Sequence, residues 1–242
     1  MEETNASREE KRPPRRRSIQ LKLNAMVICS ILAVAFGLTA ISYYVFCQRV
    51  DTKYDTTLTH AAEACANNID VDLITYFWKQ ISSEEYRALR DRAAAAGDEQ
   101  LIADWLRSRQ GYYATIVPPD TEEPGYEELD WSLMNDYEII LTVLLEIKDY
   151  FETDSAYFQY DDGLTTYNIA DVDESLLYIG SIEKPIPEFE DYQGNVEIPP
   201  IDYRSEFGWL RTAMAPVIDF RIGEAVAIAG VDINMTDVMH ER

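Results

Sequence analysis

Cysteine and histidine are scarce in this chain of 242 residues, which has three cysteines and two histidines. Cys29 and Cys47 lie in or beside an apolar segment, so only Cys65 is left for the rest of the chain. A disulfide framework cannot be built from one cysteine. His60 and His240 belong to no pattern of ligand spacing that is typical of zinc sites. We therefore expect no disulfide framework, no metal and no cofactor.

Sequence motifs of the common enzyme classes are also missing. The chain has no nucleophile elbow G-x-S-x-G, no P-loop and no G-x-G-x-x-G dinucleotide motif. A Ser-His-Asp arrangement would need His60, on an expected helix, or His240, near the C-terminus. Oxygen ligands for calcium occur in "DVDE", residues 171–174, but a surface turn is the favoured interpretation. We predict that this chain is not an enzyme.

Positive charge is sparse beyond the first 22 residues. That segment holds seven basic and four acidic residues, whereas the whole chain has a net charge of −23. The rest of the chain therefore carries about −26, which repels nucleic acid and anionic lipid. We expect no nucleic-acid partner, and an acidic surface that keeps the main domain soluble.

One long apolar run is present, and residues 23–47 contain no charged side chain. A helix of about 20 apolar residues spans a bilayer. The basic cluster lies in residues 1–22, and positive residues stay on the cytoplasmic side. We therefore expect a cytoplasmic tail over 1–22, a transmembrane helix over 23–47 and an extracytoplasmic remainder, placed at the plasma membrane. A cleavable signal peptide has a shorter apolar core and a small-residue cleavage site, so an uncleaved anchor is favoured.

The helical pattern continues beyond the apolar run. Apolar residues recur at steps of three or four, close to the helical period of 3.6, at Cys47, Val50, Tyr54, Leu58, Ala61, Cys65, Ile69, Leu73 and Tyr76. This pattern predicts one stalk helix over residues 48–81 with a single apolar stripe. The stripe can pack on its own domain or on a second copy, and both alternatives stay open. A homodimer through the stalk is our expectation.

Helical segments with cap signals follow the stalk. Ser82 and Glu85 have the spacing of a capping box before a helix that ends near Gly97. Residues 112–117, "YYATIV", suggest a short strand, and Asp130 is a candidate N-cap for a longer helix.

After residue 154 the apolar pattern changes to one typical of strands. Residues 155–172 predict a hairpin, and 208–219 and 225–235 predict two neighbouring buried strands. The order of elements predicts an α+β fold, with an antiparallel sheet flanked by helices over residues 82–240.

Three stretches carry a resemblance to a known family. They are "YFQYDDG" at 157–163, "WLRTAMAPVID" at 209–219 and "VAIAGVDINM" at 226–235. In this order, after an anchor and a long helix, they resemble a Cache-type, extracytoplasmic PAS-like sensor domain. The resemblance implies a membrane-bound signalling protein whose output module is a diguanylate cyclase, histidine kinase, phosphatase or chemoreceptor module. No such module is present in these 242 residues.

The resemblance also implies a small-molecule site between the sheet and the preceding helices and loops. Trp209, Arg211 and Asp232 are the candidate ligand contacts that it suggests, because arginine grips a carboxylate and aspartate holds an amine. The candidate walls of the site are Tyr157, Tyr160 and Tyr167. All six can equally be core, surface or turn residues.

The expected function is therefore an extracytoplasmic sensor that binds a small ligand and transmits a signal across the membrane. The alternative is a membrane-tethered acidic display protein without ligand-gated signalling. The identities of the ligand and of the output activity do not follow from the residues.

Overall fold

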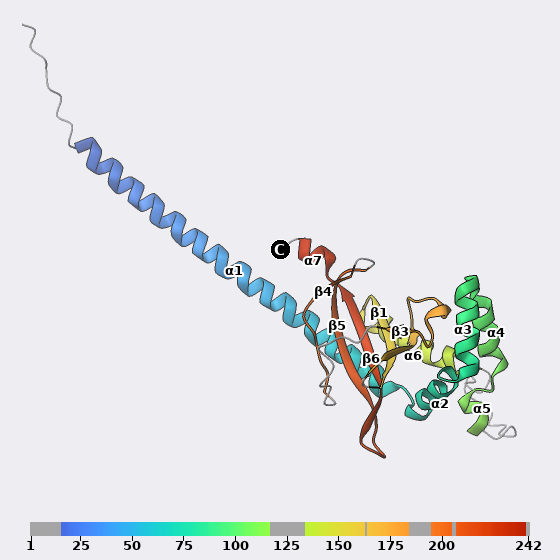
Figure 1. Ribbon diagram of the computed structural model, residues 1–242. Coiled ribbons are helices and arrows are strands. Elements are labelled where there is room, and N and C mark those ends of the chain that lie inside the picture. Colours follow the sequence, from blue (N-terminus) through green and yellow to red (C-terminus); the bar gives the residue numbers. More distant parts are fainter. Residues whose placement is uncertain (1–15, 117–133, 163, 184–194, 205–206, 241–242) are drawn as a thin grey trace, which may run out of the picture. The chain divides into compact units, whose positions relative to one another are not determined.

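The structure is a computed structural model that describes residues 16–116, 134–162, 164–183, 195–204 and 207–240 (Figure 1). The chain divides into two units, residues 1–52 and 53–242, and the first helix has residues in both. The elements are α1 (Arg16–Asn68), α2 (Val71–Ile81), α3 (Glu84–Ala96), α4 (Glu99–Ser108), α5 (Tyr112–Ile116), α6 (Asp136–Phe151), β1 (Ser155–Asp161), β2 (Thr166–Asp171), the 3-10 helix η2 (Leu176–Tyr178), β3 (Ile182–Glu183), β4 (Asp202–Arg204), β5 (Gly208–Asp219), β6 (Glu224–Asn234) and α7 (Thr236–His240).

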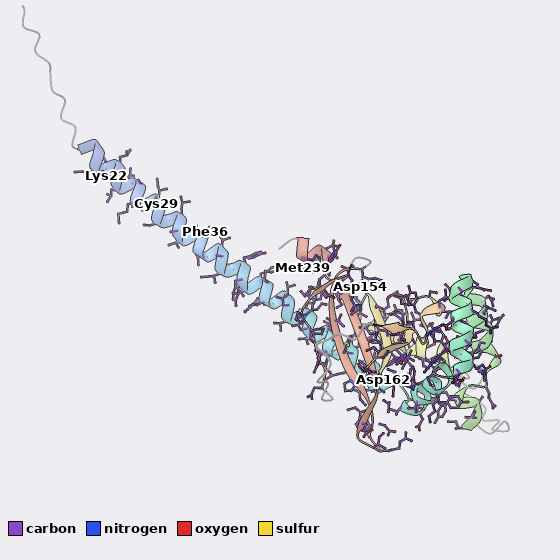
Figure 2. All side chains as sticks on the ribbon, viewed as in Figure 1. Lys22, Cys29, Phe36, Asp154, Asp162 and Met239 are labelled. Carbon is purple, nitrogen blue, oxygen red and sulfur yellow. The ribbon has the colours of Figure 1, made fainter. Side chains whose placement is uncertain are left out.

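In the first unit, α1 presents apolar side chains that are exposed on all sides, such as Cys29 and Phe36 (Figure 2). By length and composition this helix is a candidate membrane span. Two of its polar side chains are satisfied within the helix, since Ser30 Oγ donates to the Met26 carbonyl and Thr39 Oγ1 to the Ala35 carbonyl, both at 2.9 Å. Internal pairing of this kind is what a bilayer requires of polar groups.

The predicted stalk helix over 48–81 is interrupted. Helix α1 ends at Asn68, and α2 begins at Val71. Asp70 is the reason for the break, because its backbone is extended and its side chain accepts a hydrogen bond from the Asp72 amide, as an N-cap residue does. The stalk is therefore two helices joined at residues 69–70.

The apolar stripe of α1 packs on its own domain from Leu58 onward. Leu58, Ala61 and Cys65 are completely buried in the main hydrophobic core. The opposite side of this part of α1 is polar and exposed at Thr56 and His60. Of the two alternatives for the stripe, packing on its own domain holds over this part of α1.

Two of the predicted helix caps and one predicted strand are wrong in detail. Ser83, not Ser82, caps α3, and its side chain accepts from the Tyr86 amide. Asn135 caps α6 in a capping box with Glu138, whereas Asp130 lies outside the described residues. The tyrosines of the expected strand "YYATIV" begin the short helix α5 instead.

The strands form one antiparallel sheet of six strands in the order β3-β2-β1-β6-β5-β4. Both predicted hairpins are present, β1–β2 and β5–β6. The β5–β6 hairpin is the longest element of the sheet (Figure 1). The two adjacent strands β1 and β6 lie in its interior, so the first long strand pairs with the last. The α+β fold, with an antiparallel sheet flanked by helices, is confirmed.

Candidate functional site

The two faces of the sheet bury different kinds of side chain. Residues that oppose each other across neighbouring strands share a face, and successive residues alternate. Val231 of β6 opposes Ala156 and Ala213, whereas Asp232 opposes Ser155 and Thr212. The register therefore assigns the residues of β1, β5 and β6 to one face or the other.

The first face, which we call the helix-covered face, is apolar and tightly packed. Its residues share one hydrophobic core with α1, α2 and α6, and they are Ala156, Phe158, Ala213, Ala215, Val217, Ala227, Ala229, Val231 and Ile233. Alanine is frequent here, and small side chains allow helices to approach a sheet closely. This face is therefore occupied by the protein's own helices.

The second face, which we call the polar face, buries polar side chains. Among the described residues, five of the eight buried polar or charged residues lie on it, namely Gln159, Thr166, Asn168, Thr212 and Asp232. They accompany a separate small apolar cluster of Tyr157, Met214 and Ile228. A ligand site normally combines apolar walls with a few placed polar groups, and this face has both.

The six predicted site residues divide between the two faces. Tyr157 and Asp232 lie on the polar face, whereas Tyr160 and Tyr167 lie on the other face, where Tyr160 packs against the main core. Trp209 and Arg211 also belong to the helix-covered face. The six residues therefore do not line one pocket.

Arg211 already holds a carboxylate of its own chain. Its Nε and Nη2 donate to the two carboxylate oxygens of Asp55 in α1 at 2.8 and 3.0 Å, and its Nη1 donates to the Pro199 carbonyl at 3.2 Å. This is the bidentate geometry of a strong arginine–carboxylate pair. Arg211 therefore fastens β5 to α1, a role that the β5 sequence alone does not reveal.

The other aromatic candidates on the helix-covered face contact protein groups. The Tyr160 ring stacks on Trp78 of α2 with centroids 4.2 Å apart, and Tyr167 lies 5.1 Å from the same ring. Trp209 contacts the ring of Tyr203 at 5.2 Å. The Tyr160 and Tyr167 rings hold α2 to the sheet, and the Trp209–Tyr203 contact adds to the pairing of β5 with β4.

Asp232 is the charged centre of the polar face. It is buried, and the Thr212 hydroxyl donates to its Oδ1 at 2.5 Å from the neighbouring strand. On the other side of the sheet centre, Asn168 is only 2% exposed, and its Oδ1 has no hydrogen-bond partner within the described part of the chain. A buried acceptor without a partner is unusual in folded proteins, so it is a candidate for contact with a bound group.

The sequence reasoning did not select Gln159, Asn168 and Thr212. Their positions in the strands were the available signal, because residues two apart on a strand share a face of the sheet. Thr212 shares the face of Asp232, since the two residues oppose each other once β5 and β6 pair. The β1–β2 register hides this signal for Asn168, since an irregularity follows Phe158 and shifts the pairing.

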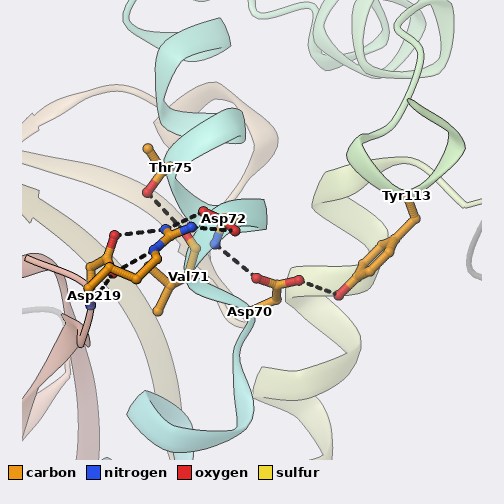
Figure 3. A network of polar contacts seen from close by, with 7 residues as sticks. Asp70, Val71, Asp72, Thr75, Tyr113 and Asp219 are labelled. Carbon is orange, nitrogen blue, oxygen red and sulfur yellow. Dashed lines mark hydrogen bonds and ion pairs between the residues drawn. The ribbon is translucent and has the colours of Figure 1, made fainter. Parts of the chain in front are cut away.

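A second polar network joins the sheet to the helices where α1 gives way to α2 (Figure 3). Arg221, in the β5–β6 turn, donates to the carboxylates of Asp72 and Asp219, with the Nη1–Asp72 Oδ2 distance at 3.0 Å. Tyr113 of α5 donates to Asp70 at 3.0 Å. Hydrogen bonds from Arg221 lower the pKa of Asp219, and burial together with Asp70 raises the pKa of Tyr113 to about 12. The junction between α1 and α2 is thus held by Arg221 of the β5–β6 turn and by Tyr113 of α5.

Residues 16–116, 134–162, 164–183, 195–204 and 207–240 contain no group of three or more His, Cys, Asp or Glu side chains arranged to hold a metal ion. The acidic side chains of the junction network are each paired with arginine or with hydroxyl and amide donors.

No protein-family model and no curated protein matches this sequence. Among solved structures, similarity is found to the sensory domain of the Campylobacter jejuni chemoreceptor Tlp3 with isoleucine bound, at 11% identity and a TM-score of 0.31, covering 72% of this chain and 67% of that one. The V. cholerae histidine kinase DctB sensor domain is similar at 14% identity and a TM-score of 0.34, covering 80% and 59%. The periplasmic domain of RsbU from Chlamydia trachomatis is similar at 11% identity and a TM-score of 0.31, covering 66% and 59%. These neighbours are sensory or periplasmic domains.

Proposed function

We propose that this chain is the sensory part of a membrane-anchored receptor. Its second unit faces the outside of the cytoplasm, binds a small ligand and biases the position of α1, which carries the signal across the plasma membrane to a cytoplasmic output. The observation that carries the proposal is the difference between the two faces of the sheet. One face is bonded to the helix that contains the candidate membrane span, and the other buries polar side chains.

The contacts along β5 support transmission to α1. Arg211, near the start of β5, pairs with Asp55, and Arg221, just beyond its end, pairs with Asp72. These two ion pairs fix the residue 53–72 segment alongside the strand at both ends. A ligand that moves β5 relative to the rest of the sheet therefore moves this segment with it. The ligand can shift the equilibrium only by its different affinities for the two positions.

The ligand contacts that we propose are Tyr157, Asp232 and Thr212, with Gln159 and Asn168 at the other end of the same face. We assign Tyr160, Tyr167, Trp209 and Arg211 to holding the helices. The basic cluster before the apolar run supports a cytoplasmic N-terminus by the positive-inside rule. The proposed output, of diguanylate cyclase, kinase, phosphatase or chemoreceptor type, lies outside these 242 residues.

We also propose a homodimer, with its contact in the part of α1 before residue 53. The stripe beyond Leu58 is already buried in the domain, so Cys47 and Val50 are the stripe positions left for a second copy. Oxidative cross-linking of the full chain in membranes is expected to give a disulfide dimer through Cys47. The Cys47→Ser variant should abolish it and Cys29→Ser should preserve it. Monomers after oxidation would contradict the dimer without affecting ligand binding.

Ligand binding is tested by a thermal-shift screen of the full chain against amino acids, amines, organic acids, polyols and cations. A ligand at about 100 times its Kd stabilises the folded state by about 2.7 kcal/mol, which for a unit of this size corresponds to roughly 5–10 °C. We expect the shift to be lost in Asp232→Asn and kept in Trp209→Phe. A shift lost equally in both variants would contradict a site on the polar face. No shift in a broad screen would favour the display alternative.

The orientation is tested separately by protease added to intact cells. Cleavage within residues 53–242 but not within 1–22 is expected. The reverse pattern would overturn the receptor proposal.

A further inference from the structure

Gly230 occupies the centre of the polar face. It lies in the middle of β6, with Tyr157 of β1 opposite on one side and Met214 of β5 opposite on the other. Glycine weakens a strand interior, and it often marks a place where another group approaches the backbone closely.

The group that approaches Gly230 is the ring of Tyr157. A Cβ added to Gly230 would overlap the ring atoms Cε2 and Cζ and would lie 2.6 Å from the hydroxyl oxygen. The ring therefore lies across the neighbouring strand against bare backbone. Met214 and Ile228 pack with this ring in a small apolar cluster that is separate from the main core, and we call the position of the ring between Gly230 and these two side chains the slot.

Polar groups lie beyond both ends of this slot. Asp232 lies two residues after Gly230 on β6, and it opposes Thr212 of β5. Gln159 lies two residues after Tyr157 on β1, at the other end of the slot. Asn168 opposes Gln159 on β2, and its buried Oδ1 is without a partner in the described residues. An apolar slot that already holds an aromatic ring, with acceptors beyond its ends, suits a planar ring that carries a hydrogen-bond donor.

We propose that this slot is a ring-binding subsite that Tyr157 fills from within the chain, and that the ligand of the polar face is a small molecule with a planar ring and a donor group. On binding, the ligand ring takes the place of Tyr157 over Gly230, and the tyrosine leaves the slot. The inference rests on the proposal that the polar face binds the ligand, but the existence of the slot can be tested without knowing that ligand.

The test is chemical rescue of the full-length Tyr157→Ala variant in detergent. The probe is p-cresol, which is the free-molecule analogue of a tyrosine side chain, and toluene is the same ring without the hydroxyl. We expect p-cresol to raise the Tm of Tyr157→Ala and to bind about fivefold more tightly than toluene, because polar groups at the ends of the apolar slot can pair with its hydroxyl. The wild-type chain, titrated in parallel, corrects for uptake of the probes by detergent.

Phe158→Ala is the matched control, since Phe158 is the adjacent residue and is completely buried on the helix-covered face. Its cavity is apolar, so toluene should bind there at least as well as p-cresol. If Tyr157→Ala does not fold alone, the same titration is read as folding induced by the probe. Rescue by toluene equal to that by p-cresol, or rescue by neither, would overturn the subsite and leave the receptor proposal to be judged by the ligand screen.

Gly230→Ala provides a second, independent measurement. The added methyl group must displace the Tyr157 ring, so the 19F signal of 3-fluorotyrosine at position 157 should move to a solvent-exposed environment. An unchanged signal would show that the ring does not depend on the glycine, which would contradict the subsite.

Discussion

The two faces of the sheet are built from alternate residues of the same strands, yet they differ in what they bury. Ala213 and Ala229 lie under helices on one face, whereas Thr212 and Gly230 lie among polar and aromatic groups on the other. Small apolar residues suit permanent packing, and buried polar groups suit recognition because they discriminate among partners. The comparison indicates that stability is concentrated on the helix-covered face, and it supports the proposed ligand site on the polar face.

The largest expected effect separates the faces at two adjacent residues of β1. Phe158→Ala removes a completely buried ring from the main core, and we expect a loss of about 3–5 kcal/mol in the free energy of unfolding. Gln159→Ala, on the polar face, should cost clearly less. Urea denaturation of the full chain, followed by tryptophan fluorescence, measures both. Equal losses would break the comparison.

The second prediction concerns the attachment of the helix-covered face to α1. Arg211→Gln leaves Asp55 without its bidentate partner, and since both side chains are partly exposed we expect a loss of about 1–2 kcal/mol. Hydrogen exchange should rise at residues 53–68. Arg211→Lys keeps the charge but not the fork geometry and should give an intermediate result. Unchanged exchange in α1 would show that the ion pair does not fasten the helix.

The third prediction concerns the polar face. Thr212→Val removes the hydroxyl that donates to Asp232 while keeping the shape of the side chain, so we expect a loss of about 1 kcal/mol. Thr212→Ser keeps the donor and should retain most of the hydrogen-bond contribution. In a ligand titration, Thr212→Val should weaken binding more than it lowers the Tm. Loss of stability without any change in binding would assign Thr212 to structure alone.

Much of the fold is predictable because it depends on local patterns. The strand periods of 208–219 and 225–235, with a turn between them, specify the β5–β6 hairpin, and the helical steps of Leu58, Ala61 and Cys65 identify the buried side of α1. The break at residues 69–70 was missed because the apolar steps continue across it. The deciding feature there is one side chain, Asp70, that caps the next helix.

The candidate site is less predictable because it depends on which residues share a face. Arg211 and Asp232 look equally suited to a ligand in the sequence, but the register places them on opposite faces. The partner of Arg211 is 156 residues away in α1, and no local pattern identifies such a contact. Asp232 stays a predicted ligand contact and lies on the polar face, whereas its neighbours there become visible only after the strands are paired.

The smallest expected effect concerns a carboxylate that is buried among the helices α2, α5 and α6. Asp136, at the start of α6, is 4% exposed, and it accepts hydrogen bonds from the Tyr112 amide at 2.6 Å and from Gln80 Nε2 at 3.2 Å. Burial raises the pKa of Asp136, although these two hydrogen bonds oppose the rise. A raised pKa means that the folded chain holds the proton more tightly than the unfolded chain, whose aspartate pKa is about 3.9.

Stability contributed by Asp136 should therefore increase as the pH falls from neutrality through the raised pKa, and level off below about 4. The Asp136→Asn variant does not titrate, so the Tm of the wild type minus that of the variant should rise over this range. Asp219→Asn is the control of opposite sign, since Arg221 lowers the pKa of Asp219 and its contribution is lost as the pH falls. A wild-type advantage over Asp136→Asn that shrinks on acidification would mean that the hydrogen bonds outweigh burial. The helices around Asp136 would then stabilise a buried charge as well as the polar face does. The contrast between the two faces of the sheet would in that case apply only to uncharged side chains.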